Sequence, residues 1–288
     1  MPVTDGIIRE REKVRLKGNA CRIVEKLYDK NLFSNTIVER IAYLSDGLLV
    51  RGYVARPSNE GTYPVLIWNR GGYGDKGALS DLTAYLILAS TAAWGYVVLA
   101  SQYRGNRQSE GLEDWGGDDL HDALNMTHVA ENVPECDPER IAIEGPSRGG
   151  MVTYRALAQN HDFKCAIIHA GITDLRQMMQ GKPDFARIID RHLGRLSEAD
   201  KNARLDELSA THIAKKFSRN CPILIMHGDK DKTVPIEQSE MLVKKLIEYD
   251  IPHKYIRIKD GTHVALKDGS YKEIDYYRRE WLAKYLAE

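Results

Sequence analysis

The sequence lacks several features that would place the protein in a specialised class. No stretch approaches the roughly 20 apolar residues that a membrane-spanning helix needs, and the start, MPVTDGIIREREK, has no apolar signal-peptide core. Lys plus Arg and Asp plus Glu number 41 each, so no net charge attracts nucleic acid or an anionic membrane. The four cysteines form no CxxC pair, which argues against a zinc site or a disulfide framework. We therefore expect a cytoplasmic protein with no metal or other cofactor and no nucleic-acid or membrane partner.

Short apolar runs recur along the sequence and predict buried strands. An alternating segment at 41–57 turns at Asp46 and Gly47, which predicts an antiparallel hairpin. Near-continuous apolar strands that alternate with helices are typical of a mostly parallel sheet covered by helices on both faces. The predicted fold class is therefore α/β. The apolar runs, most of them separated by segments of helical spacing, occupy residues 64–68, 96–101, 140–144, 165–170, 222–227 and 253–258.

The spacing of these runs also predicts how the chain is organised. Residues 19–32 have a loose helical pattern, so residues 1–40 are expected to form a helical lead-in and residues 41–288 a single α/β domain. One interval, residues 171–220, is too long to be a structureless loop in a compact domain. We expect it to be a helical insertion that covers the sheet as a lid.

One serine lies between two glycines where a strand meets a helix. Residues 145–149, GPSRG, fit the pattern GxSxG, in which a sharp strand-to-helix turn exposes the serine hydroxyl above the sheet. The N–H group of Arg148, at the start of the helix, would point toward a developing oxyanion. The alternative is an ordinary turn in which Ser147 only caps the helix, so the motif needs partner residues.

A nucleophilic serine needs a base, and the base needs an acid that orients it. In this architecture the chain order is serine, acid, histidine. Two histidines lie late enough in the sequence: His263 follows the last apolar run, whereas His253 begins that run and is expected to pack at the far edge of the sheet. Asp231 and Asp229 both follow the strand at 222–227. We favour Asp231, because Asp229 would more naturally cap the turn.

Three of these segments together resemble a known family. They are GPSRGG at 145–150, HGDKDKTVP at 227–235 and DGTH at 260–263, and in this order they are similar to the catalytic domain of the prolyl oligopeptidase family of α/β-hydrolase serine enzymes. The resemblance covers about residues 40–288, and YRGNRQSEG at 103–111 and GGDDLHDALN at 116–125 also fit it. It implies an α/β-hydrolase fold with Ser147 as nucleophile, Asp231 as acid and His263 as base. The β-propeller of many relatives has no counterpart in this sequence.

A glycine-rich loop after the first parallel strand has two interpretations. Its GxGxxG pattern at 72–77 matches a dinucleotide fingerprint, but the acid that would hold the ribose about 20 residues later is missing. We therefore expect no nicotinamide cofactor, and expect the backbone of Gly72 and Tyr73 to complete the oxyanion hole with Arg148. Arg70 stands where relatives have His or Tyr before the glycine pair.

Three further residues are candidates for substrate binding. Arg104, like Arg148, could hold a substrate carboxylate, Trp115 could contact an apolar group and His169 could line the pocket. The corresponding alternatives are a surface salt bridge, packing and a core histidine. The predicted partner is a small-molecule or short-peptide substrate.

The predicted function is that of a serine hydrolase. The chain would cleave a peptide or aminoacyl amide, or a carboxylic ester, through an acyl-enzyme on Ser147. Two alternatives stay open at this stage. One is a carboxylesterase with no peptidase activity, and the other is a non-catalytic binding protein that uses the pocket of a hydrolase fold.

Overall fold

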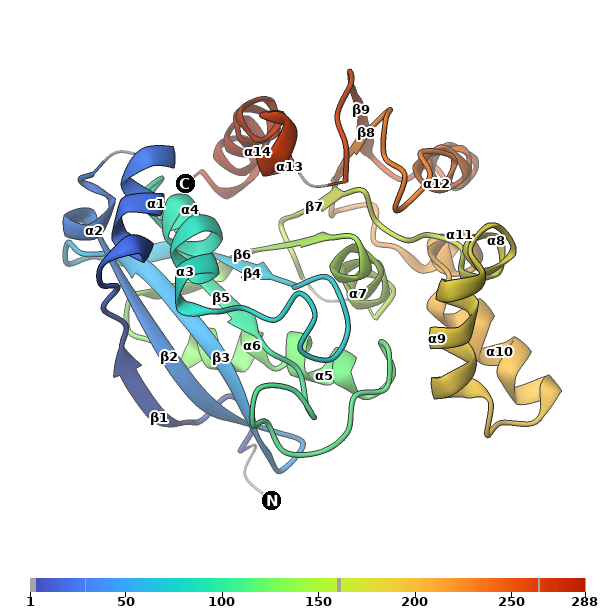
Figure 1. Cartoon of the computed structure of the whole chain (residues 1–288), viewed down its shortest axis with the longest axis horizontal. Coiled ribbons are helices and arrows are strands. Elements are labelled where there is room, and N and C mark those ends of the chain that lie inside the picture. Colours follow the sequence, from blue (N-terminus) through green and yellow to red (C-terminus); the bar gives the residue numbers. More distant parts are fainter. Residues whose placement is uncertain (1–3, 29, 160–161, 264, 288) are drawn as a thin grey trace. The chain divides into compact units, whose positions relative to one another are not determined.

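Strands and helices alternate along the chain in the computed structural model shown in Figure 1, which describes residues 4–28, 30–159, 162–263 and 265–287. The chain forms two compact units. Unit 1 comprises Met1–Glu113 and Asp118–Ala142, and unit 2 comprises Asp114–Gly117 and Ile143–Glu288. Strand β6, Cys136–Pro146, begins in unit 1 and ends in unit 2.

Unit 1 contains the antiparallel part of the sheet. Its strands lie in the order β1-β2-β3-β5-β4, antiparallel except for the parallel pair β4 and β5. Their bounds are Ile8–Lys13 (β1), Thr36–Ser45 (β2), Leu48–Pro57 (β3), Tyr63–Trp68 (β4) and Val97–Ser101 (β5). The helices of this unit are Asn19–Leu27 (α1), Leu32–Asn35 (α2), Asp81–Thr83 (α3), the π-helix Ala84–Ala89 (η1), Ser90–Ala92 (α4), Asp119–Leu124 (α5) and Met126–Glu131 (α6).

The predicted hairpin is confirmed at β2 and β3. Ser45 pairs with Leu48, which leaves a two-residue turn. Both turn residues have positive φ, 51° at Asp46 and 78° at Gly47. A two-residue loop with two positive φ angles matches the right-handed twist of the strands that it joins, and Asp-Gly is a preferred pair for it.

In the segment predicted as a helical lead-in, the structure has the helices α1 and α2 and also the strand β1. The IREREK segment of β1 pairs antiparallel with β2, so it shares a sheet with residues beyond position 40. The strand is not recognisable in the sequence, because its exposed positions are charged and the alternation of apolar and polar residues that marks a strand is absent. Such charges are typical of an edge strand that must not pair with another chain. The division into 1–40 and 41–288 stays a prediction.

Unit 2 contains parallel strands in the order β7-β8-β9. Each predicted apolar run overlaps a strand, and the predicted insertion at 171–220 is helical over α8 to α11 and η2. The strands are Cys165–His169 (β7), Ile223–Gly228 (β8) and His253–Ile258 (β9). The helices are Arg148–Leu157 (α7), Leu175–Gly181 (α8), Pro183–Leu193 (α9), Glu198–Leu208 (α10), Ala210–Ile213 (α11), the 3₁₀ helix Ala214–Lys216 (η2), Glu237–Glu248 (α12), Ala265–Asp268 (α13) and Tyr271–Leu286 (α14). Within the described ranges, no helix combines the length and the apolar character needed to cross a membrane.

A buried ion pair joins the last helix to the strand that leads to Ser147. Arg278 of α14 donates from Nε and Nη2 to the two carboxylate oxygens of Glu144, at 2.8 and 2.9 Å. Its Nη1 donates to Asp275 at 2.7 Å. Burial raises the pKa of Glu144 even though Arg278 favours the charged form. The charged form of Glu144 is therefore stable in this buried position only because Arg278 is paired with it.

We predict that Arg278→Met lowers the free energy of unfolding by about 3–5 kcal/mol, because it leaves the Glu144 carboxylate buried and unpaired. Denaturant unfolding measures the change. The double variant Glu144→Gln with Arg278→Met should recover part of the loss, since it removes the orphaned charge. A single variant as stable as the parent would contradict this account of the pair.

Candidate active site

Ser147 occupies a strained turn between β6 and α7. Its backbone has φ 56° and ψ −124°, a conformation that residues with a side chain rarely adopt. A Cβ at Gly145 would lie 2.2 Å from the carbonyl oxygen of Gly149, so the turn requires glycine there. The strand, the sharp turn and the following helix are the context that the GxSxG pattern predicts.

The structure brings Ser147, Asp231 and His263 together in unit 2. His263 Nε2 lies 3.1 Å from Ser147 Oγ, and His263 Nδ1 lies 2.7 Å from Asp231 Oδ2. Since the carboxylate can only accept, Nδ1 carries the proton and Nε2 is left to accept from the serine hydroxyl. The alternative acid and the alternative base have other partners. Asp229 accepts from the backbone N–H of Asp260, and His253 contacts the carbonyl of Ile251.

The carboxylate of Asp231 is buried and held at both oxygens. Oδ1 accepts from the backbone N–H groups of Thr233 and Val234 at 2.8 and 2.9 Å, and Oδ2 accepts from His263. Burial alone would raise the pKa of Asp231. The side chains of His227 and His263 and the N–H of Val234 outweigh burial and hold this pKa below its usual range. The group is therefore charged and oriented at neutral pH.

His169 ends β7 beside Ser147, and its carbonyl accepts the Ser147 N–H at 2.9 Å. The imidazole is half-buried. Burial lowers the pKa of His169 to about 4. Charge interactions with His227, His263 and Arg278 act in the same direction, whereas the interaction with Asp231 opposes them. The predicted substrate contact of this imidazole stays a prediction.

The lowered pKa of His169 predicts a stability change in mild acid. Between pH 6.5 and 4 the unfolded chain binds a proton on this imidazole and the folded chain does not, so stability falls as the pH drops through this range. The difference corresponds to at most about 3 kcal/mol. Denaturant unfolding at several pH values measures it, with His169→Gln as the control in which this contribution is absent. If the free energy of unfolding of the parent and of His169→Gln depended on pH in the same way between pH 6.5 and 4, the lowered pKa of His169 would be contradicted.

The predicted oxyanion residues lie in different units. Arg148 is the first residue of α7 in unit 2, which places its N–H at a helix N-terminus. Gly72 and Tyr73 lie in unit 1, in the loop after β4. Gly72 has φ 71°, and a Cβ there would lie 2.0 Å from the carbonyl oxygen of Lys76. The loop therefore needs glycine for its own conformation, and the donor roles of Gly72 and Tyr73 stay predictions.

Arg104 and Trp115 are buried, and each contacts other residues of its own unit. Arg104 is 6% exposed, and its guanidinium donates to Asp122 at 2.9 Å and to Asp46 at 2.7 Å. The Trp115 ring is 2% exposed, with the guanidinium carbon of Arg148 5.1 Å from its centre. These contacts favour the alternative interpretations, an ion pair and packing, although the Arg104 pair is buried and not at the surface. The Arg148 side chain likewise packs on the ring.

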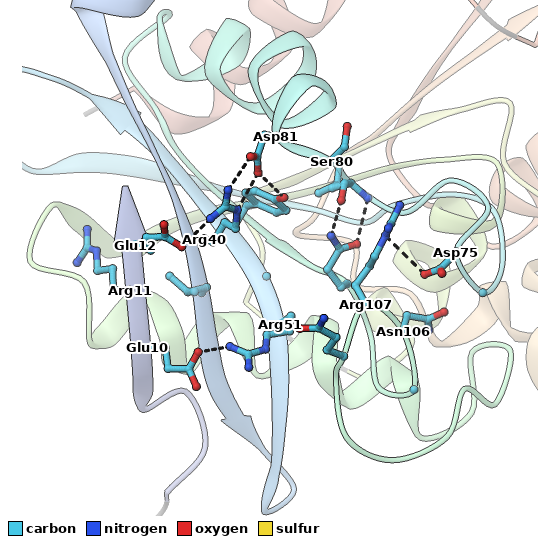
Figure 2. Close-up of a pocket in the computed structure, with 18 residues that line it drawn as sticks. Glu10, Arg11, Glu12, Arg40, Arg51, Asp75, Ser80, Asp81, Asn106 and Arg107 are labelled. Atoms are coloured by element: carbon cyan, nitrogen blue, oxygen red, sulfur yellow. Dashed lines mark hydrogen bonds and ion pairs between the residues drawn. The ribbon is translucent and has the colours of Figure 1, made fainter. Parts of the chain in front are cut away.

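Unit 1 also contains a charged cavity of about 1060 Å³, shown in Figure 2. It is lined by β1 to β3, by the start of α3 and by the loops that follow β4 and β5. Its acidic side chains face arginines: Glu10 faces Arg51, Glu12 and Asp81 face Arg40, and Asp75 faces Arg107. The lining is therefore charge-balanced, and its ion pairs join strands and loops of the same unit.

Sequence reasoning passed over one buried histidine near Asp231. His227, at the end of β8, is fully buried and lies 3.5 Å from Asp231 Oδ2. The chain order serine, acid, histidine points only to histidines after the acid, and His227 precedes it. Its position could have indicated a role, because it lies at the carboxyl end of a predicted strand, four residues before Asp231. In the part of the chain that the structure describes, no cluster of three or more His, Cys, Asp or Glu side chains is placed to hold a metal ion.

Comparison with known sequences finds relatives over most of the chain. Residues 83–288 match the sequence profile of the Prolyl oligopeptidase family, Peptidase_S9. The uncharacterized peptidase YtmA of Bacillus subtilis is 29% identical over 242 residues, which cover 84% of this chain and 91% of that protein. Dipeptidyl-peptidase 5 of Porphyromonas endodontalis is 25% identical over 221 residues, which cover 71% of this chain and 30% of that protein.

Solved structures share the fold. A puromycin-hydrolyzing peptidase of Mycobacterium tuberculosis has a TM-score of 0.73 at 22% identity, over 88% of this chain and 46% of that one. An acylaminoacyl peptidase of Pyrococcus horikoshii has a TM-score of 0.69 at 25% identity, over 93% of this chain and 42% of that one. The predicted α/β-hydrolase architecture, a mostly parallel sheet with helices on both faces, is confirmed. The chain spans less than half the length of these two solved chains.

Proposed function

Since the chain belongs to the prolyl oligopeptidase family, as its motifs predict, and is a serine hydrolase of the peptidase type, we propose that it hydrolyses short peptides or aminoacyl amides through an acyl-enzyme on Ser147. One observation carries the proposal. The side chains of Asp231, His263 and Ser147 form a continuous hydrogen-bonded series, with separations of 2.7 and 3.1 Å. This series has the geometry that activates a serine hydroxyl.

In the proposed mechanism, His263 Nε2 takes the hydroxyl proton as Ser147 Oγ attacks the substrate carbonyl carbon. Asp231 stabilises the imidazolium that forms. His263 then gives this proton to the leaving amine or alkoxide, and the carbonyl is restored as an acyl-enzyme. Water then attacks the acyl carbon and gives a proton to the same nitrogen. The bond from this carbon to Ser147 Oγ breaks, His263 returns the proton to Oγ, and the carboxylic acid leaves.

The negative charge on the carbonyl oxygen needs donors in the tetrahedral intermediate. We assign one to the backbone N–H of Arg148, because the N-terminal end of α7 favours negative charge. The backbone of Gly72 and Tyr73 is assigned as the second donor, since the glycine loop lets the main chain approach a reacting atom. The helical insertion at 171–220 is assigned as the lid that shapes the substrate pocket.

A matched substrate panel tests peptidase against esterase activity. We expect the chain to hydrolyse aminoacyl p-nitroanilides and the p-nitrophenyl esters of the same acyl groups, the esters faster because their leaving group is better. Ser147→Ala measured in parallel removes background hydrolysis from both series. Hydrolysis of esters with none of amides would replace the proposal with its carboxylesterase alternative. Hydrolysis of neither, with ligand binding retained in Ser147→Ala, would favour a binding protein.

A further inference from the structure

Behind the carboxylate of Asp231 lies a second set of buried polar side chains that the proposed mechanism does not use. His227 of β8 and Ser239 of α12 are both 0% exposed. His227 Nδ1 lies 2.7 Å from Ser239 Oγ, and His227 Nε2 lies 2.9 Å from the carbonyl oxygen of Val234. Both ring nitrogens of this histidine therefore have a partner within unit 2.

These partners fix which nitrogen carries the proton. A backbone carbonyl can only accept, so the Val234 oxygen requires a proton on His227 Nε2. In the neutral ring Nδ1 is then an acceptor, and the Ser239 hydroxyl donates to it. The Val234 carbonyl thus selects the tautomer of His227, and the Ser239 hydroxyl holds the ring in place by donating to the other nitrogen.

The fixed tautomer holds the loop that carries Asp231. Val234 is bound from two sides: its carbonyl accepts from His227, and its N–H donates to Asp231 Oδ1 at 2.9 Å. The same Nε2–H group lies 3.5 Å from Asp231 Oδ2, the oxygen that accepts from His263. This separation is too long for a good hydrogen bond, but His227 is among the groups that hold the pKa of Asp231 below its usual range.

We infer that His227 and Ser239 are positioning residues for the proposed catalytic machinery. They hold the Asp231 carboxylate in the orientation in which it accepts from His263 Nδ1, so that His263 Nε2 stays available to Ser147. The inference rests on the proposed function. Neither side chain touches the reacting atoms, and each acts through the Val234 backbone and the Asp231 carboxylate.

Two replacements of His227 separate positioning from packing. Gln retains an amide N–H near the place of Nε2 that can donate to Val234, whereas Leu has a comparable volume and no donor. We expect His227→Leu to lower kcat about 10- to 100-fold, by analogy with the loss found when groups that orient metal-binding side chains are removed, with KM changed less than about twofold. We expect His227→Gln to keep kcat within about fivefold of the parent. Equal kcat values for the folded Leu and Gln variants would overturn the inference.

Proton NMR gives a readout that does not depend on turnover. The His263 Nδ1–H, bonded to Asp231, should give a downfield resonance that is absent in His263→Gln. We expect it to persist in His227→Gln and to shift upfield or broaden in His227→Leu. If His227→Leu does not fold, Ser239→Ala decides: a lowered kcat with a displaced resonance supports the inference, and an unchanged kcat with an unchanged resonance overturns it. An inactive parent would refute the proposed function, while the resonance would still test the positioning.

Discussion

Replacing Ser147 by alanine is expected to lower kcat for the best amide or ester substrate by about 10⁴- to 10⁶-fold, with little change in KM. The proposed mechanism requires the Oγ atom, which lies 3.1 Å from His263 Nε2, to form the acyl-enzyme. Alanine keeps the backbone and the Cβ, so the turn between β6 and α7 gains no new steric demand. Steady-state kinetics together with thermal unfolding measures the two effects separately.

Ser218→Ala is the matched control, because this serine lies in the loop before β8 and its hydroxyl accepts a local backbone N–H, from Asn220. We expect parent-like kinetics from it. If a well-folded Ser147→Ala enzyme kept more than about 1% of the parent's kcat, measured free of parental contamination, the acyl-enzyme on this residue would be refuted.

Replacing Asp231 by asparagine is expected to lower kcat about 10⁴-fold through the tautomer of His263. The backbone N–H groups of Thr233 and Val234 donate to Oδ1, so they hold the amide oxygen of an asparagine on that side. The amide NH₂ would then face His263 Nδ1, where Oδ2 now accepts. His263 would have to accept at Nδ1 and carry its proton on Nε2, which could no longer take the proton of Ser147.

Asp229→Asn is the matched control in the same loop. Its carboxylate accepts from the backbone N–H of Asp260 at 2.7 Å, and an amide oxygen can do the same. We expect kcat within about threefold of the parent for this variant. Comparable losses in the two variants would show that the loop as a whole, and not the acceptor facing His263, limits turnover.

Most of the fold could be predicted from the sequence because its signals are local. The apolar runs that became β4 to β9 are short and nearly continuous, and Asp46-Gly47 marks the turn of the hairpin. Strand β1 could not be predicted in this way, because its stability comes from backbone bonds to β2 and its side chains are mainly charged. One boundary between the two units falls within β6, between Ala142 and Ile143, in the middle of an apolar run that gives no sign of it.

The candidate site residues were predictable to different degrees. Ser147, Asp231 and His263 each follow a strand in a motif, so their meeting could be expected from chain order. Arg104 and Trp115 could not be judged in this way, because their burial depends on Asp122, Asp46 and Arg148, which are distant in sequence. His227 was missed because its partners, Ser239 and the Val234 carbonyl, are recognised only once β8 and α12 have packed.

The activation of Ser147 is tested most directly by reaction with a fluorophosphonate. An activated serine attacks the phosphorus, the bond from phosphorus to serine oxygen forms and fluoride leaves, so the protein gains one phosphonyl group. The account predicts a single adduct, mapped by mass spectrometry to Ser147 in the native protein. The adduct should be absent in Ser147→Ala and in unfolded protein, and strongly slowed in Asp231→Asn. A native protein that stays unmodified while a control serine hydrolase reacts, or an adduct on another residue, would contradict it.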